Sequence, residues 1–420
     1  MRHVLLRSAR LTDGELVDIG VVDGLIDSVH PAGTATSPNV PVQVMDLNGR
    51  LVLPAFTEPH AHLDKTGTVD RVPNPTGDLG GAITAWLAHR PTLTVDDVLT
   101  RARVALRRAA LNGVLTLRTH VDTGAGVFLT AMEAIAQLRT EVQDLVELQI
   151  VACASLPITG AAGRENLTRL RDALRYGVDA VGGAPSLDPD PVAAVDALAD
   201  IAADAGLPLD LHIDETLDPA VFVLPHLATV ATAFDLPVTA GHCVSLAMQP
   251  APTRRAVADQ LAAAGVAVVT LPQTNLYLQG RDLGPHRPRG LTAVAELRAA
   301  GVVVAGGSDN IADPFNPIGR TDPLETASLL VAAGQLDVGS ALDAVTTAAR
   351  QAIGLPPAPL APGMPADLVA IDAASPADAV GRAPAARLVL RRGQPVATTT
   401  VVEAWSGDDR RDHRTLHGRR

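Results

Sequence analysis

The chain has 420 residues, of which 47% are hydrophobic and only 2% aromatic, and its formal net charge is −12. A chain of this length and apolar content can bury a large core, enough for a barrel of ~250 residues and a smaller companion domain. The scarcity of aromatic side chains and the dispersed basic residues argue against a nucleic-acid-binding surface.

The sequence also bears on the cellular compartment. Its two cysteines, Cys153 and Cys243, have no spacing that suggests a disulfide scaffold. The N-terminal segment lacks the long apolar core of a signal peptide, and no run approaches the ~18 apolar residues that span a bilayer. We therefore expect a cytoplasmic protein that is not a membrane protein.

Both ends of the chain carry short β-type patterns. Near the N-terminus they cover residues 4–6, 16–22 and 25–29, with a hairpin turn at Asp23-Gly24. Near the C-terminus, residues 363–371 and 386–393 predict a turn with a strand and a strand with a turn. We expect residues 1–50 and 360–405 to form one small β-sandwich-like domain, and the charged, aperiodic residues 406–420 to be a disordered tail.

The middle of the chain, residues 51–359, alternates apolar strands with helices rich in alanine and leucine, such as 192–205 and 253–264. The apolar run 51–56 is interpreted as the first buried strand. The other strand candidates cover residues 114–120, 148–153, 180–183, 208–212, 238–242, 266–271 and 302–307. Eight strand–helix units predict a (β/α)8 TIM barrel of the α/β class, and such barrels build active sites at the C-terminal ends of their strands.

The segment from Pro59 to Lys65 contains two histidines directly after the first predicted strand. Because side chains alternate between the faces of a strand, His60 and His62 are expected to project to the same side. Such a pair can contribute to a metal site, but it also arises by chance, so further ligands are needed.

Further candidates stand at later strand ends. His212 closes the fifth predicted strand, His242 closes the sixth, and Asp309 follows the eighth. Glu215 lies three residues beyond His212. A surface, capping or turn role is the alternative for each residue taken alone. We interpret His120, at the end of the second predicted strand, as structural, with a catalytic role left open.

These residue types suit metal-assisted hydrolysis. Imidazoles and a carboxylate can hold a divalent ion and leave a position for water, whose pKa the ion lowers to about 7. Glu215 is placed to take a proton from that water and deliver it to a leaving nitrogen. His242 can orient and stabilise the hydroxide. Asp309 could be a ligand, a second acceptor for the water proton, or both.

In combination, these segments resemble the amidohydrolase superfamily, and within it the cytosine deaminase-like branch. The matching stretches are residues 58–64, 118–122, 148–152, 212–215, 241–242, 278–281, 308–310 and 313–314.

The resemblance implies one catalytic metal ion, Zn²⁺ or Fe²⁺, held by His60, His62, His212 and Asp309. It also implies that Glu215 is the proton shuttle and that His242 contacts hydroxide and substrate. The fourth predicted strand ends in Gly182-Gly183-Ala184-Pro185, without the carboxylated lysine of binuclear relatives, so a second metal ion is not expected.

Departures from the cytosine deaminase pattern argue against cytosine as the substrate. Where those enzymes carry a glutamine that reads the pyrimidine edge, in a Phe-Pro-Gln-Glu-Gly context, this chain has Ala154-Ser155-Leu156-Pro157-Ile158. Where they carry a second aspartate and a tryptophan, it has Asn310 and Phe315. Loss of a side chain that hydrogen-bonds the substrate changes which heterocycle can bind, because a buried polar group without a partner costs free energy.

Lys65 gives a further indication about the substrate. The sequence His-Leu-Asp-Lys is similar to relatives that act on N-substituted aminotriazines, the N-isopropylammelide amidohydrolase-type enzymes. Lys65 could meet an oxo group or an anion of the substrate, or it could be a surface cation paired with Asp64 or Asp70.

We interpret the chain as a metal-dependent hydrolase that releases ammonia or an amine from a pyrimidine-, triazine- or purine-like heterocycle. The substrate-binding candidates are Lys65, Ser155, Asn275, Gln279, Asn310 and Phe315. Hydrolysis of a cyclic amide on the same site is an alternative, and a non-catalytic binding protein is another. A small heterocyclic substrate is the expected partner, and a homo-oligomer is expected by analogy.

Overall fold

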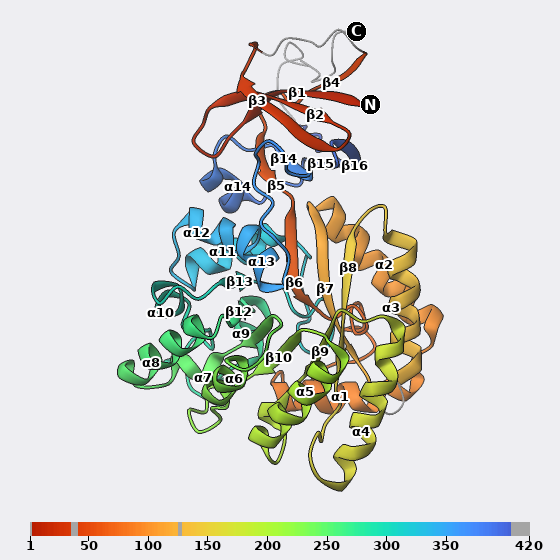
Figure 1. Cartoon of the computed structure of the whole chain (residues 1–420), viewed down its shortest axis with the longest axis vertical. Coiled ribbons are helices and arrows are strands. Elements are labelled where there is room, and N and C mark those ends of the chain that lie inside the picture. Colours follow the sequence, from red (N-terminus) through yellow and green to blue (C-terminus); the bar gives the residue numbers. More distant parts are fainter. Residues whose placement is uncertain (1, 35–40, 125–127, 405–420) are drawn as a thin grey trace.

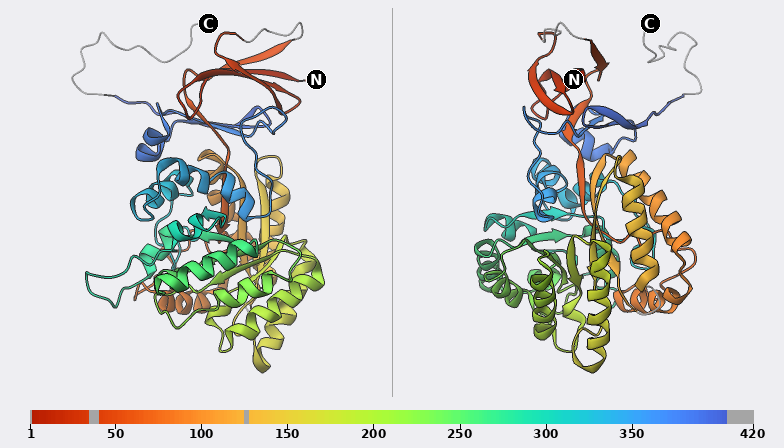
Figure 2. Two further views of the ribbon diagram at one scale, coloured as in Figure 1. Left: turned by 60° about the vertical axis from the view of Figure 1, so that its left-hand side comes forward. Right: turned by 45° about the vertical axis from the view of Figure 1, so that its right-hand side comes forward.

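The computed structural model describes residues 2–34, 41–124 and 128–404. The tail expected at residues 406–420 lies outside these ranges. Figures 1 and 2 show a β-rich part, built from both ends of the chain, on top of a larger part in which helices surround a central sheet. No helix in the described ranges is both long enough and apolar enough to cross a membrane.

The terminal segments form a mixed sheet with the strand order β16-β15-β14-β5-β1-β2-β3, in which β4 pairs with β1. Its strands are β1 (His3–Arg10), β2 (Leu16–Val22), β3 (Leu25–Pro31), β4 (Val42–Asp46), β5 (Leu51–Pro54), β14 (Leu368–Ile371), β15 (Arg387–Arg391) and β16 (Gln394–Thr399). Leu6 and Ile19 from the N-terminal strands share one buried cluster with Leu368 and Leu390. The prediction that both ends of the chain build one β-structure is confirmed.

The apolar run at residues 51–56 is not a single strand, as the sequence suggested. It is divided between two sheets: β5 pairs antiparallel with β14, and β6 (Phe56–Ala61) pairs parallel with β7. The chain crosses at Ala55, whose N–H donates to Asp367 O, while the N–H of Phe56 donates to Gly113 O. Pro54 has no N–H to continue the first ladder. Both halves are buried, so hydrophobicity does not reveal the break.

The larger part contains the predicted barrel. Its parallel strands follow one another in chain order: β6, β7 (Val114–Asp122), β8 (Glu147–Cys153), β9 (Ala180–Gly183), β10 (Leu209–Ile213), β11 (Val238–His242), β12 (Ala267–Thr270) and β13 (Val304–Gly306). The first and last strands meet through a parallel bridge between Ala61 and Asp309. Asp309 N donates to His60 O at 2.9 Å, and His62 N donates to Asp309 O at 3.2 Å. Three of the predicted ligands, His60, His62 and Asp309, therefore lie at the closing seam of the barrel.

Helices follow the barrel strands and cover the outside of the sheet (Figure 1). They are α2 (Val95–Leu111), α3 (Phe128–Val142), α4 (Gly160–Ala173), α5 (Pro191–Ala205), α6 (Leu224–Ala231), α8 (Ala251–Ala263), α10 (Val294–Ala299) and α11 (Pro323–Ala332). The remaining helices are α1 (Leu79–His89), α7 (Val244–Ala247), α9 (Pro272–Leu278), α12 (Val338–Ala344), α13 (Thr347–Ala352), α14 (Pro376–Arg382) and the 3-10 turns η1 (Arg90–Thr92), η2 (Leu174–Tyr176) and η3 (Pro185–Leu187).

Local sequence explains the helix ends where the prediction was close. In α5, the Asp190 side chain accepts from Ala193 N, Pro191 occupies the first turn, and Gly206 ends the helix with φ 64°. These are the preferred residues for a helix start, a first turn and a left-handed end.

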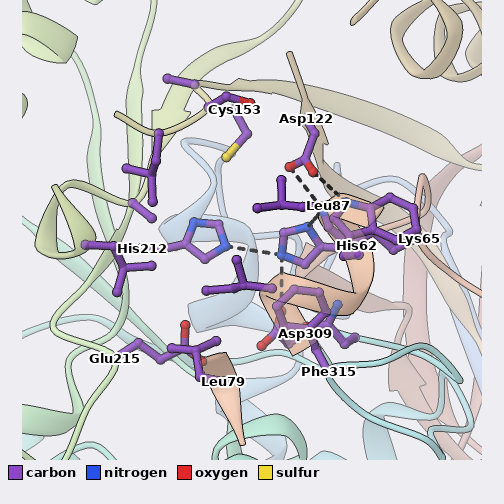
Figure 3. Close-up of a pocket in the computed structure, with 18 of the residues that line it drawn as sticks. His62, Lys65, Leu79, Leu87, Asp122, Cys153, His212, Glu215, Asp309 and Phe315 are labelled. Carbon is purple, nitrogen blue, oxygen red and sulfur yellow. Dashed lines mark hydrogen bonds and ion pairs between the residues drawn. The ribbon is translucent and has the colours of Figure 1, made fainter. Parts of the chain in front are cut away.

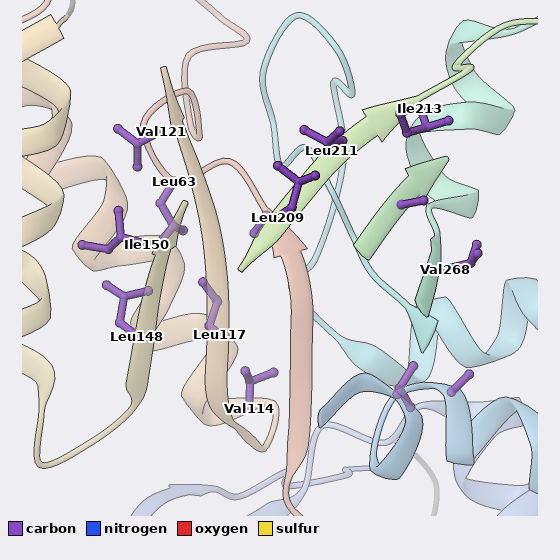
Figure 4. Packing of buried hydrophobic residues seen from close by; sticks show 14 of the residues in the cluster. Leu63, Val114, Leu117, Val121, Leu148, Ile150, Leu209, Leu211, Ile213 and Val268 are labelled. Atoms are coloured by element: carbon purple, nitrogen blue, oxygen red, sulfur yellow. The ribbon is translucent and has the colours of Figure 1, made fainter. Parts of the chain in front are cut away.

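Alternation along the barrel strands decides what enters the barrel. Leu209, Leu211 and Ile213 belong to the hydrophobic cluster shared with the helices, as Figure 4 shows for β10 beside the neighbouring strands. The residues between them, Asp210 and His212, must therefore point to the other face. This alternation directs His212 into the barrel.

Candidate active site

Four predicted ligands meet at the mouth of the barrel. His62 Nε2 lies 3.1 Å from His212 Nε2 and 3.2 Å from Asp309 Oδ1. His60 Nε2 lies 3.2 Å from His212 Nε2 and 3.7 Å from Asp309 Oδ1. Figure 3 shows the side chains of His62, His212 and Asp309 turned toward one another. Their elements are far apart in sequence, so the tertiary fold makes this cluster.

The cluster fits one divalent cation. A tetrahedral ion at 2.0–2.1 Å from its ligands separates the ligand atoms by about 3.4 Å, close to the four distances of 3.1 to 3.7 Å given above. Among the described residues, the buried Asp309 Oδ1 has no hydrogen-bond partner by geometry. Imidazole nitrogens with one carboxylate form a donor set that suits zinc and iron. His60, His62 and Asp309 form one group close enough to hold such an ion, and His212 lies against both histidines.

Burial prepares the histidines for this role. Removal from water lowers the pKa of His60 and His212 well below the usual value, and the neighbouring histidines of His60 lower its pKa further. Burial likewise lowers the pKa of His62 to about 3, with Lys65 adding to the effect. At neutral pH these imidazoles are uncharged and have a lone pair available for coordination.

Two acid–base candidates flank the cluster. His242 Nε2 lies 4.0 Å from Asp309 Oδ2, and His242 Nδ1 lies 3.5 Å from Glu215 Oε1. Burial raises the pKa of Glu215 well above its usual value, and the nearby Asp309 adds to the increase. Burial lowers the pKa of His242 to about 3. Asn275 fixes the imidazole of His242 through a contact of 3.1 Å between its Nδ2 and His242 Nδ1.

The backbone is strained where these groups leave their strands. Asp214, His242 and Asp309 have positive φ values of 51°, 69° and 63°. Such conformations cost non-glycine residues about 1–3 kcal/mol each and persist where the surroundings enforce them. Asp214, next to Glu215, accepts hydrogen bonds from Val223 N, Leu224 N and the Ser186 hydroxyl. These bonds hold the loop that carries Glu215.

A cavity of about 170 Å³ opens above the cluster. One wall comes from α1, where Leu79, Ile83, Trp86 and Leu87 line the cavity. Their i, i+4, i+7 and i+8 spacing places them on one helix face. Phe315 adds a further ring. The result is an apolar space beside the acid–base groups, suited to a flat ring.

Lys65 is buried, so it is not the surface cation that one interpretation allowed. Its Nζ lies 3.1 Å from Asp122 Oδ1, 3.4 Å from Asp64 Oδ2 and 3.3 Å from His62 Nδ1. The expected partner Asp64 is present, whereas Asp70 does not contact it by any described ion pair. Lys65 also lines the cavity, with its charge balanced by carboxylates.

The structure separates the other substrate-binding candidates into two groups. Ser155, Asn310 and Phe315 line the cavity. Asn275 instead holds His242, and Gln279 donates to Glu215 O at 3.0 Å from a neighbouring cavity. These two residues support catalytic candidates and do not line the cavity above the histidine cluster.

His120 lies directly beneath the cluster. Its ring is fully buried, with its centroid 3.9 Å from that of His60 and 4.8 Å from that of His212. Both of its nitrogens lack hydrogen-bond partners within the described ranges. Its Nε2 also lies 3.7 Å from Asp210 Oδ1. His120 belongs to two groups of side chains close enough to hold a metal ion, one with Cys153 and His212 and one with His60 and Asp210. A structural role and a catalytic role therefore both stay open.

Sequence reasoning missed four residues of the site. Glu58 accepts hydrogen bonds from His60 N and Ser308 N, which ties β6 to the loop after β13. Asp122 accepts from the Trp86 indole at 2.8 Å and pairs with Lys65, and Arg90 lines the cavity. Glu58 stands within a recognised motif. Trp86 and Arg90 lie in a long connection with no local signal of their function.

Comparisons with known proteins agree with this geometry. A model described as "Amidohydrolase family" matches residues 43–397. Pterin deaminase of Rhizobium rhizogenes is 36% identical over 386 residues, which cover 90% of this chain and 87% of the relative.

Two solved structures are also similar. The 5-methylcytosine deaminase of Klebsiella pneumoniae, with bound 5-fluorocytosine, has 30% identity and a TM-score of 0.87, covering 96% of this chain and 99% of that chain. N-isopropylammelide isopropylaminohydrolase of Burkholderia multivorans has 30% identity and a TM-score of 0.80, covering 95% and 99%. The chain described here therefore belongs to the amidohydrolase family and is a hydrolase of carbon–nitrogen bonds other than peptide bonds.

Proposed function

We propose that this protein is a metal-dependent deaminase of amino-substituted nitrogen heterocycles, with a pterin-type ring as its substrate. One divalent cation, zinc or iron(II), would be held by His60, His62, His212 and Asp309. The similar enzymes named above act, by their names, on a pterin, on 5-methylcytosine and on N-isopropylammelide. All three are planar nitrogen heterocycles with an exocyclic amine.

One observation carries the proposal: a proton-transfer group stands beside the cation-binding cluster at one end of an apolar cavity. Glu215, His242 and Asp309 line the same cavity as Leu79 and Phe315. This combination fits hydrolysis at a carbon within an aromatic ring, since the ring needs an apolar space and the amine needs a proton donor.

A divalent cation bound at the cluster supplies Lewis acidity and makes a nearby water more acidic. In the reaction, the Glu215 carboxylate takes one proton from the attacking water and passes it to the ring nitrogen beside the amino-bearing carbon. The second water proton goes to the departing nitrogen as the C–N bond breaks. The products are the oxo heterocycle and ammonia, so one water is consumed for each amine released.

The other site residues orient the reactants. His242, held by Asn275, faces the same space as Glu215 and can donate a hydrogen bond to the oxygen that adds to the carbon. Leu79, Ile83 and Phe315 enclose the ring and limit access of bulk water. Their apolar surface selects a flat substrate without fixing which polar edge it presents.

The pterin assignment is supported by sequence similarity and by the polar groups of the cavity. The relative with 36% identity is a pterin deaminase. Ser155 contributes a short side chain to the cavity wall, and Asn310 turns its Nδ2 toward Asp313 Oδ2 at 2.8 Å. A shorter side chain and a retracted one leave room for a ring larger than a pyrimidine.

The test combines metal analysis with a substrate screen. The purified protein should contain zinc or iron and should release ammonia from pterin faster than from aminated pyrimidines, purines or triazines. A product one water heavier than its substrate, with no ammonia released, would point instead to cyclic amide hydrolysis. A protein without bound zinc or iron that stays inactive after either metal is added would overturn the proposal.

Two variants separate the roles of the residues. Glu215→Gln should retain the metal but lose turnover by about 10²–10⁴-fold, because an amide cannot shuttle protons. His60→Ala should lose metal occupancy. Glu141→Gln, which changes an exposed carboxylate on α3, is the matched control. Full activity in Glu215→Gln would remove Glu215 from the role proposed here.

A further inference from the structure

A second group of metal-ligating side chains lies beside the candidate cation cluster. It consists of His120, Cys153 and His212, and we call it the thiol triad. Each residue offers one ligand atom, and these atoms lie within 4.8 Å of one another. The three residues stand near the C-terminal ends of β7, β8 and β10. The barrel therefore brings together one sulfur and two imidazole nitrogens from strands that are distant in sequence.

The thiol triad is distinct from the group that carries the proposed reaction. His60, His62 and Asp309 form a group of three by the same distance measure. The two groups have no residue in common. His212 lies against both histidines of the first group and also belongs to the thiol triad. The barrel mouth thus contains three ligands for each of two ions.

His120 is the member of the triad whose surroundings most favour an ion. Its side chain is completely buried. Neither Nδ1 nor Nε2 has a hydrogen-bond partner among the residues that the structure describes. Buried polar atoms are normally satisfied by protein, by water or by an ion. A cation bound through one ring nitrogen would supply such a partner.

The other group that contains His120 is less suited to a cation. In that group His120 is combined with His60 and Asp210, whose side chains are fully buried. Asp210 Oδ2 already accepts from the Arg118 guanidinium at 2.7 Å, which balances its charge. Cys153, by contrast, lines the cavity, so an ion that enters the cavity meets the thiol triad first.

The position of Cys153 also favours a cation. Figure 3 shows its sulfur turned toward the ring of His212, on the side where Asp122 lies. Burial raises the pKa of the Cys153 thiol and the Asp122 carboxylate raises it further, whereas Lys65 opposes this effect. The thiol is therefore protonated at neutral pH. The same carboxylate that disfavours a thiolate attracts a cation, and a bound ion deprotonates a thiol that coordinates it.

The donor set of the thiol triad selects the kind of ion. Thiolate and imidazole ligands suit zinc and related thiophilic ions, whereas magnesium and calcium prefer oxygen ligands. When the ion binds, the S–H bond breaks, a sulfur–metal bond forms and the proton passes to solvent. One proton is therefore released for each ion bound by the triad.

We propose that His120, Cys153 and His212 bind a second, thiophilic divalent cation, such as zinc, beside the ion of the His60 cluster. The missing lysine at the end of the fourth barrel strand argues only against a lysine-bridged pair of ions. In the thiol triad a thiolate supplies the negative charge. The inference goes beyond the proposed deamination and does not depend on it, because it concerns metal binding alone.

The experiment titrates the metal-depleted full-length protein with cobalt(II), a substitute for zinc. A cobalt–thiolate bond gives a charge-transfer absorption in the near ultraviolet. The wild type should bind two equivalents of cobalt, with this absorption and the release of one proton accompanying one of them. Cys153→Ser should lose the absorption and retain one equivalent. Cys243→Ser, which changes the other buried free cysteine, is the matched control and should keep the absorption.

Two further variants separate the two ions. His62→Ala removes a ligand of the first group, so the absorption should persist. His120→Asn should weaken binding of the absorbing equivalent at least ~10-fold, since even loss of a group that supports a ligand costs that much. It also provides the test if circular dichroism shows that Cys153→Ser does not fold. Added zinc should displace the absorbing cobalt, whereas the same concentration of magnesium should not.

Three results would overturn the second site. They are cobalt binding to the wild type without the thiolate absorption, an absorption that persists in Cys153→Ser, and its loss in a folded His62→Ala. The last result would show that one ion uses ligands of both groups. A protein that shows the absorption but deaminates no heterocycle would retain the second site and refute the proposed function.

Discussion

Replacement of Lys65 by methionine tests the charge network beside the candidate ligands. Methionine keeps most of the volume but leaves Asp64 and Asp122 without their cation. The two contacts, at 3.4 and 3.1 Å, correspond to about 5 kcal/mol each at an effective dielectric constant of about 20. Desolvation of the three charges opposes this attraction. Breaking a buried pair by removing one partner typically costs about 3–5 kcal/mol.

This loss translates into a measurable change in melting temperature. At about 2.1 cal/mol/K per residue, a chain of this length has an unfolding entropy of ~0.9 kcal/mol/K, so a loss of 4 kcal/mol lowers Tm by about 4–5 °C in a single transition. Differential scanning calorimetry at pH 7 measures the shift. Arg103→Met, which breaks the more exposed pair with Glu141, should change Tm by less than about 1 °C.

The stability loss caused by replacing Lys65 should depend on pH, because it involves the ionised Asp122 carboxylate. Burial alone raises the pKa of Asp122, but Lys65 and Arg90 outweigh burial and hold that pKa below its usual range. This stabilisation is present above the ordinary carboxylate pKa and is lost as pH falls through the lowered value. Without Lys65 the carboxyl binds a proton more readily, so the defect should be smaller at pH 4.5 than at pH 7. Adding Asp122→Asn should recover part of the loss. A Tm within 1 °C of wild type at pH 7 would refute the reasoning.

Three further predictions concern the barrel seam, a pocket loop and the cation. Glu58→Ala should lower the free energy of unfolding, measured by urea denaturation, by about 2–4 kcal/mol, because the buried N–H groups of His60 on β6 and of Ser308 in the loop after β13 lose their acceptor. Glu58→Gln should cost less, and equal stability of the two variants would contradict this. Burial raises the pKa of Asp188, but hydrogen bonds from Thr159 and the backbone N–H of Ile158 outweigh it and lower the pKa. The stability difference between wild type and Asp188→Asn should therefore be largest at pH 7 and should shrink as the pH falls. A stability difference that stays constant down to pH 3 would show that the Asp188 carboxylate does not contribute to the pH dependence of stability. Treatment with a chelator should lower Tm, and added zinc or iron(II) should restore it. At a free metal concentration of 100 times Kd, binding adds about 2.7 kcal/mol to the free energy of unfolding. An unchanged Tm after both treatments would show that the proposed site is absent.

Much of the site could be predicted because its residues stand at strand ends. A strand reverses its side-chain direction at every residue, so the spacing of His60 and His62 is informative before any tertiary contact is known. Parallel strands of a barrel end at one face, which places His212, His242 and Asp309 near that pair once the strand order is inferred. Periodicity and chain order were sufficient for these positions.

The break at Ala55 and the cavity wall could not be predicted in the same way. Hydrophobicity reports burial but does not reveal which sheet a strand joins, so residues 51–56 were interpreted as one strand. Arg90 and Trp86 lie on a connection whose helix faces the cavity only after Asn74 and Asp78 fix its start.

The sequence by itself therefore determined the barrel, its companion sheet and the residues able to hold a cation. Only the tertiary structure decided that Lys65 is balanced by two carboxylates and that His120 and Cys153 lie beside His212. The physical reason is the separation along the sequence of the residues that interact. Strand alternation acts between adjacent residues, whereas the partners of a buried charge come from segments that only the folded chain brings together.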